Sequence, residues 1–180
     1  MNMEINPSEY KILIVDDVMS NVLLLKVLLT NEKFAIATAN NGRQALEQVD
    51  KERPDLLLLD VMMPDLSGFE VAQRLKSNPD TADIPIIFLT ALNSTTDIVK
   101  GFQAGASDFI SKPFNKEELI IRVTHQVSLV AAKRIILNKT EELQRIIAGR
   151  DKLYSVIAHD LRSPMGSIKM VLNMLMLNLP

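Results

Sequence analysis

The chain has 180 residues, with 20 Lys and Arg against 22 Asp and Glu, 47% hydrophobic residues, no cysteine and a formal net charge of −2. Positive charge is neither in excess nor gathered in runs, so we expect no nucleic-acid or anionic-membrane surface, and the lack of cysteine excludes disulfides, thiolate catalysis and cysteine-ligated metals. No apolar run approaches the ~18 residues of a membrane-spanning helix and no secretory signal opens the chain, so we expect a cytoplasmic protein.

Residues 11 to about 128 alternate short apolar runs with amphipathic stretches. Five runs have the character of strands: 11–15, 34–39, 55–60, 84–90 and 108–110. Three are continuously apolar, as in parallel strands that helices cover on both faces. Helix signals follow them, including a capping box formed by Ser67 and Glu70 and a cap at Asn115 before an acidic first turn. The repeats predict an α/β domain with a doubly wound, five-stranded parallel sheet.

Beyond residue 128 no strand is predicted, and residues 127–148 form one long predicted helix without Gly or Pro. Apolar residues continue there at spacings of three and four, which indicates the seam of a coiled coil or bundle. Pro164 should interrupt and bend the helix, because its ring clashes with the preceding turn and it has no N–H. Since the apolar stripe must be buried, we expect a homodimer through the C-terminal helix, over residues 129–179.

Acidic residues stand at the ends of two predicted strands, Asp16 and Asp17 after the first and Asp60 at the end of the third. In an open sheet with the flavodoxin-like strand order, ligands bind where the carboxyl ends of strands one and three meet. Three unpaired carboxylates at that place would repel one another and take up a proton, so the cluster needs a cation. Oxygen ligands of this kind favour Mg²⁺.

Two further strand-end residues add chemistry to the same edge. Thr90 closes the fourth strand with a hydroxyl group, and Lys112 follows the fifth with an ammonium group. A cation, an ammonium and a hydroxyl around one carboxylate can hold the charge of a transferring phosphoryl group, which would make Asp60 the nucleophile. Each residue alone has an ordinary structural explanation, and their shared location is what favours a site.

The stretch over residues 10–127 resembles the receiver domain of two-component response regulators. The resemblance rests on the motifs VDDVMSN (15–21), LLLDVMMPDLSGFE (57–70), FLTA (88–91) and SKPF (111–114). It implies that Asp60 accepts a phosphoryl group from a phosphohistidine donor or another phosphorelay protein. It also implies that Asp17, Asp60 and the backbone carbonyl of Met62 bind the metal directly, with Asp16 acting through water.

The same resemblance implies a conformational switch. Thr90 and Phe109 would move together on phosphorylation, and Lys112 would precede a cis Pro113. Met62, two residues after Asp60, is apolar and cannot orient an attacking water, so we expect slow loss of the aspartyl phosphate.

A second candidate phosphoacceptor lies near the C-terminus, where His159 and Asp160 are adjacent. A neighbouring carboxylate can help an exposed imidazole to act as a neutral nucleophile, although for an isolated pair a solvated helix face is the simpler interpretation. The segment around HDLRSP (159–164) resembles the H-box of histidine kinases, the phosphoacceptor helix of their dimerisation and histidine phosphotransfer domain. This implies that His159 is phosphorylated and that Asp160 is its general base.

These features predict three regions: a receiver domain over 10–127, a helical linker or coiled coil over 128–149, and the first helix of a partial dimerisation and histidine phosphotransfer domain over 150–180. No Asn-rich box or Gly-rich nucleotide lid follows. We therefore expect a hybrid histidine kinase whose ATP-binding domain is either cut off in this sequence or present on a separate chain. The apolar face of the last predicted helix would otherwise lack a covering helix, which favours truncation.

Two other functions are compatible with the sequence. One is a plain response regulator whose C-terminal helix is a dimerisation or partner-binding module, with His159 incidental. The other is a metal-dependent phosphatase or nucleotide-binding α/β enzyme that uses Asp16, Asp17 and Asp60. The second is disfavoured because no Gly-rich phosphate loop opens a helix.

Overall fold

A computed structural model describes residues 5–91 and 95–177, apart from the side chains of eleven of these residues. These are residues 95–98, 161, 163, 164, 167, 174, 175 and 177, of which 161, 163 and 164 lie in the HDLRSP motif. The chain divides into two units, Met1–Ala132 and Lys133–Pro180, which are treated separately below.

The first unit alternates strands and helices along the whole of its length. Its strands are β1 (Lys11–Val15), β2 (Ala35–Ala39), β3 (Leu56–Asp60), β4 (Ile86–Thr90) and β5 (Asp108–Ser111). A 3₁₀ turn, η1 (Pro7–Glu9), precedes α1 (Met19–Asn31), α2 (Gly42–Glu52), α3 (Gly68–Ser77), α4 (Thr95–Gln103) and α5 (Lys116–Leu177). The strands are all parallel, in the order β2-β1-β3-β4-β5. The predicted flavodoxin-like, doubly wound, five-stranded sheet is therefore confirmed.

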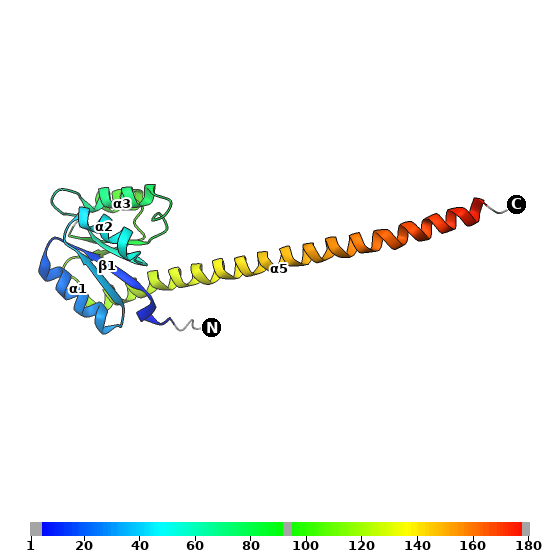
Figure 1. Cartoon of the computed structure of the whole chain (residues 1–180). Helices are drawn as coiled ribbons and strands as arrows, with labels where there is room; N and C mark the ends of the chain where they lie inside the picture. Colours follow the sequence, from blue (N-terminus) through cyan, green and yellow to red (C-terminus); the bar gives the residue numbers. More distant parts are fainter. Residues whose placement is uncertain (1–4, 92–94, 178–180) are drawn as a thin grey trace. The chain divides into compact units, whose positions relative to one another are not determined.

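Side chains of the central strands alternate between two cores, one on each face of the sheet. In β3, Leu57 and Leu59 pack on the side of α2 and α3, whereas Leu56 and Leu58 pack on the side of α1 and the start of α5. Figure 1 shows these helix pairs on opposite faces. Each fully buried leucine contributes roughly 1.5–3 kcal/mol to folding. Burial on both faces explains why these strands are continuously apolar.

Side-chain hydrogen bonds cap the helices that begin near the carboxyl ends of the strands. The Ser67 side chain accepts from the backbone N–H of Glu70, and the Glu70 carboxylate accepts from the Ser67 N–H, so the predicted capping box is present. The Asn115 side chain likewise accepts from the N–H of Glu118. Capping holds the beginning of α3 next to the end of β3, which positions the loop after Asp60.

The end of α5 that belongs to the first unit is part of its core. Leu119, Val123 and Val127 are buried, and burial continues to Ala131. The apolar face of this part of the helix therefore covers the sheet.

In the second unit, α5 continues without a break to Leu177, so the predicted interruption at Ser163-Pro164 is wrong. Pro164 removes one helical hydrogen bond, but a helix can pass through a proline at a cost of about 3 kcal/mol. Every described side chain between Lys133 and Met176 is exposed. None of the helices, as far as they are described, is long and apolar enough to cross a membrane.

Candidate functional site

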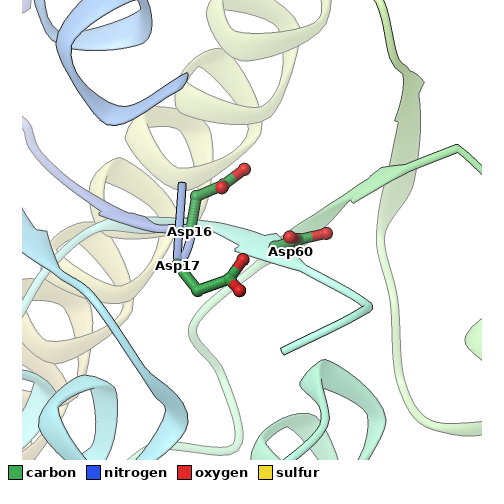
Figure 2. A group of neighbouring side chains, drawn as sticks. All are labelled: Asp16, Asp17 and Asp60. Carbon is green, nitrogen blue, oxygen red and sulfur yellow. The ribbon is translucent and has the colours of Figure 1, made fainter. Parts of the chain in front are cut away.

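Three carboxylates meet at the carboxyl ends of β1 and β3. Asp16 and Asp17 follow β1, Asp60 is the last residue of β3, and one oxygen from each lies within 4.8 Å of the others. Figure 2 shows the three side chains gathered at the strand ends. Asp16 is 0% exposed and Asp60 4% exposed, whereas Asp17 is open to solvent. The predicted convergence of these residues is observed, because neighbouring parallel strands end at the same edge.

Asp16 is held by several donors. Its Oδ1 accepts from the backbone N–H of Val18 at 2.9 Å, and Asn21 Nδ2 donates to Oδ1 at 3.1 Å and to Oδ2 at 3.0 Å. Lys112 Nζ donates to Oδ2 at 2.8 Å. A buried carboxylate is costly unless it is paired and hydrogen-bonded, and these contacts meet that need.

Lys112 joins the two buried carboxylates. Its Nζ lies 2.8 Å from Asp16 Oδ2 and 2.9 Å from Asp60 Oδ2. Burial alone would lower the pKa of Lys112, but its hydrogen bonds to Asp16 and Asp60 and their charges outweigh burial, so the pKa is raised. The backbone N–H of Lys112 donates to the carbonyl of Thr90, and the bond to Pro113 is cis, as expected. The ammonium group therefore stays charged and lies between the Asp16 and Asp60 carboxylates.

The charge of Asp60 is only partly compensated by its neighbours. Its pKa is raised, chiefly because burial disfavours the charged form, and the charge of Asp16 acts in the same direction. Hydrogen bonds from Lys112 and from the backbone N–H of Met62, at 3.3 Å, act against that rise without cancelling it. The single ammonium group of Lys112 therefore does not neutralise the charge of these three carboxylates. Three oxygen donors around one point suit a divalent hard cation such as Mg²⁺.

The predicted switch residues occupy neighbouring strands. Thr90 ends β4 and is 6% exposed, and Phe109 lies in β5 beside Phe88 of β4. The Phe109 ring is 5.8 Å from the Phe88 ring and 4.8 Å from the ring of Phe102 in α4. Phe109 is therefore partly buried among aromatic side chains.

Two contacts at this site were not found from the sequence. Asn21 lies within the motif VDDVMSN, and its spacing of five residues from Asp16 was the available signal. The close approach of Gly101 to Phe109 has no comparable signal, because it joins a helix to a strand through tertiary packing.

The second candidate site is in the other unit. His159 Nδ1 lies 3.4 Å from Asp160 Oδ1, and their side chains are 85% and 73% exposed. The pair is therefore accessible to solvent, as expected for a phosphoacceptor and equally for a solvated helix face.

Comparison with known proteins supports the interpretation of the first unit. Residues 12–124 match the family described as the response regulator receiver domain. The chain belongs to the response-regulator receiver family. Receiver domains act in two-component signalling.

The curated relatives are longer proteins. The chain is 42% identical to the response regulator PleD of Caulobacter vibrioides over 140 residues, which are 78% of this chain and 30% of PleD. It is also 42% identical to the DNA-binding response regulator MtrA of Mycobacterium tuberculosis over 113 residues, which are 63% of this chain and 48% of MtrA. The matches thus cover less than half of either relative.

Solved structures show the same fold. The chemotaxis response regulator CheY4 of Vibrio cholerae is 32% identical with a TM-score of 0.62, and the match covers 65% of this chain and 98% of that one. The signal receiver domain of a signal transduction histidine kinase from Syntrophus aciditrophicus is 34% identical with a TM-score of 0.61, covering 68% and 91%.

Proposed function

We propose that Asp60 accepts a phosphoryl group from a phosphohistidine donor in a two-component phosphorelay. The observation that carries this proposal is the placement of Lys112, whose ammonium joins Asp16 and Asp60 at the edge where the three acids meet. An oxygen of Asp60 would attack phosphorus and form a phosphorus–oxygen bond as the phosphorus–nitrogen bond breaks. The departing imidazole keeps the electron pair of that bond and takes a proton from solvent.

The residues that surround Asp60 would have separate roles. Lys112, already 2.9 Å from Asp60, would move onto the phosphoryl oxygens and neutralise part of their charge. The hydroxyl of Thr90 would donate to the same group and carry the change to Phe109. Both residues stand at the ends of strands, so rigid backbone holds them near the acceptor.

Asp16, Asp17 and Asp60 would hold Mg²⁺, with the backbone carbonyl of Met62 as a further ligand and Asp16 acting through water. When bound, the ion would supply positive charge that offsets the carboxylates and the incoming phosphoryl group. The raised pKa of Asp60 is consistent with a site that is short of positive charge.

The test is phosphorylation by a small phosphodonor with Mg²⁺, followed by intact-mass spectrometry. The wild-type chain should gain one phosphoryl group that alkali and hydroxylamine remove, as they do from an acyl phosphate. Asp60→Asn should gain none, and the matched control Asp50→Asn, at an exposed position of α2, should label like the wild type. Persistent labelling of Asp60→Asn would refute the assignment.

The second half of the proposal is that this receiver regulates a cytoplasmic histidine kinase whose phosphoacceptor is His159, with Asp160 as general base. The resemblance to the H-box supports it, and the exposure of both side chains is compatible with it. The structural relative from Syntrophus aciditrophicus is described as a receiver domain of a histidine kinase. ATP would be needed only by a longer parent chain.

The competing function is a plain response regulator whose C-terminal helix dimerises or binds a partner. It is supported by PleD and MtrA, which are described as response regulators. Supplying a separate kinase ATP-binding domain and ATP distinguishes the two. Phosphohistidine on His159, absent from His159→Gln, supports the hybrid kinase, and its absence supports the regulator.

A further inference from the structure

Two side chains donate to the buried carboxylate of Asp16, and they differ in kind. Lys112 is charged and is shared with Asp60, whereas Asn21 is neutral and spans both oxygens of Asp16 at 3.1 and 3.0 Å. The remaining donor is the backbone N–H of Val18, which reaches Oδ1. Oδ2, the oxygen that Lys112 contacts, therefore has Asn21 as its other donor.

The two donors would behave differently during phosphoryl transfer. If Lys112 moves to the phosphoryl oxygens, Asp16 loses its ion pair at the moment when its orientation toward the cation matters. Asn21 is the third residue of α1, and its backbone N–H is bonded to the carbonyl of Val18 at 2.9 Å. Its amide can therefore stay on Asp16 while Lys112 leaves.

The neutrality of Asn21 also matters. A cationic side chain at this position would satisfy Asp16 but would repel Mg²⁺ at a distance of a few ångströms. An amide satisfies the lone pairs of the carboxylate without adding charge. Residues that orient a metal ligand through hydrogen bonds typically change metal affinity by 10- to 100-fold when they are removed.

We propose that Asn21 is a positioning residue, which holds the Asp16 carboxylate in its metal-binding orientation while Lys112 exchanges between the carboxylates and the phosphoryl group. This inference rests on the proposed function of Asp60. It assigns Asn21 no contact with the phosphoryl group itself.

The test is the Mg²⁺ affinity of the full chain, measured by isothermal titration calorimetry without a phosphodonor. Asn21→Ala should raise the dissociation constant roughly 10- to 100-fold. The Mg²⁺ concentration that gives half-maximal phosphorylation should rise by the same factor, with the rate at saturating Mg²⁺ close to that of the wild type. Ser20→Ala, an exposed neighbour in the same helical turn, should bind Mg²⁺ like the wild type.

Two further variants distinguish the hydrogen bonds that the Asn21 side chain donates from the packing of that side chain. Asn21→Leu keeps the size of the side chain and removes its donor, so it should bind Mg²⁺ as weakly as Asn21→Ala. Asn21→Ser keeps a shorter donor and should recover part of the affinity. In an Asp16→Asn background, replacing Asn21 with Ala should have little further effect, because the carboxylate that it positions is gone.

The outcomes distinguish this inference from the function on which it rests. A wild-type chain that binds no Mg²⁺ and is not phosphorylated refutes the proposed function. A wild-type chain that does both, while Asn21→Leu binds Mg²⁺ equally well, refutes the positioning role of Asn21. The positioning role is also refuted if Asn21→Leu lowers the Mg²⁺ affinity by the same factor in the wild-type and Asp16→Asn backgrounds. The effect would then not act through Asp16.

Discussion

The ring of Phe109 lies directly against Gly101, so closely that a Cβ added at Gly101 would overlap Cζ of Phe109. Gly101 belongs to α4 and Phe109 to β5, the strand whose end carries Lys112. The ring is also in edge contact with Phe102, the next residue of α4. The missing side chain at position 101 is therefore what leaves room for the observed position of the ring.

The first prediction is that Gly101→Ala destabilises the receiver unit by about 1–3 kcal/mol, the usual cost of overpacking. In a background of Phe109→Ala the same change should become neutral or stabilising, because alanine is the better helix former by ~1 kcal/mol. Urea unfolding of the four chains measures the coupling. An equal cost in both backgrounds would show that the ring is not the obstacle.

The second prediction follows from the raised pKa of Asp60. A carboxyl whose pKa is higher in the folded than in the unfolded chain loses stability as pH rises from the unfolded value, 3.8, through the folded one. Asp60→Asn should therefore have a higher melting temperature than the wild type at pH 7 without Mg²⁺, and the difference should vanish below the unfolded pKa.

Thermal unfolding across that pH range checks the prediction, with Asp50→Asn as an exposed control that should follow the wild type. Mg²⁺ should raise the melting temperature of the wild type more than that of Asp60→Asn, because a ligand of the folded state stabilises it. A melting-temperature difference between Asp60→Asn and wild type that does not depend on pH would contradict the account.

The third prediction concerns Lys112. Lys112→Ala leaves two buried carboxylates without their ammonium partner, and removing one member of a buried pair costs about 3 kcal/mol. Part of that loss should return with Mg²⁺, which would replace the missing charge. Urea unfolding with and without Mg²⁺ is the measurement, and Lys51→Ala, whose side chain is 73% exposed, should change little. A chain that tolerates Lys112→Ala equally well in both conditions would count against charge pairing at the site.

The sequence predicts those parts of the site that depend on topology. The sequence alone predicts that three carboxylates lie close together, those of Asp16, Asp17 and Asp60, because parallel strands in this order end side by side. The capping box at Ser67 was likewise predictable from local hydrogen bonding alone.

The features that the sequence did not predict depend on contacts between side chains, or on a local energetic cost that the surrounding structure offsets. Gly101 contacts Phe109 across two elements, which neither residue type signals. Asn21 is close to Asp16 in sequence, but that spacing alone does not show that its amide donates to the carboxylate. Pro164 failed as a helix stop because its local cost is small beside the rest of a helix that continues on both sides. Local rules therefore set preferences that the surrounding structure can override.

The last prediction concerns the C-terminal helix. Exposed apolar residues recur along the second unit, with Ile136, Leu143 and Ile157 at multiples of seven residues, so they lie on one side of the helix. A stripe of this kind favours association with a second copy of the chain. Since burial in the first unit extends to Ala131, a chain that ends at Ala132 keeps its whole core.

We therefore expect the full chain to sediment as a dimer and the chain ending at Ala132 as a folded monomer. Leu143→Lys should raise the dimer dissociation constant at least about a hundredfold, because it removes apolar burial and places two charges together. Asn138→Lys, two residues after Ile136 and on the opposite side of the helix, should leave it unchanged. Analytical ultracentrifugation over a range of concentrations gives the constants. A shortened chain that dimerises as strongly as the full one would place the interface on the receiver unit, and would leave the exposed apolar stripe of α5 for a different partner.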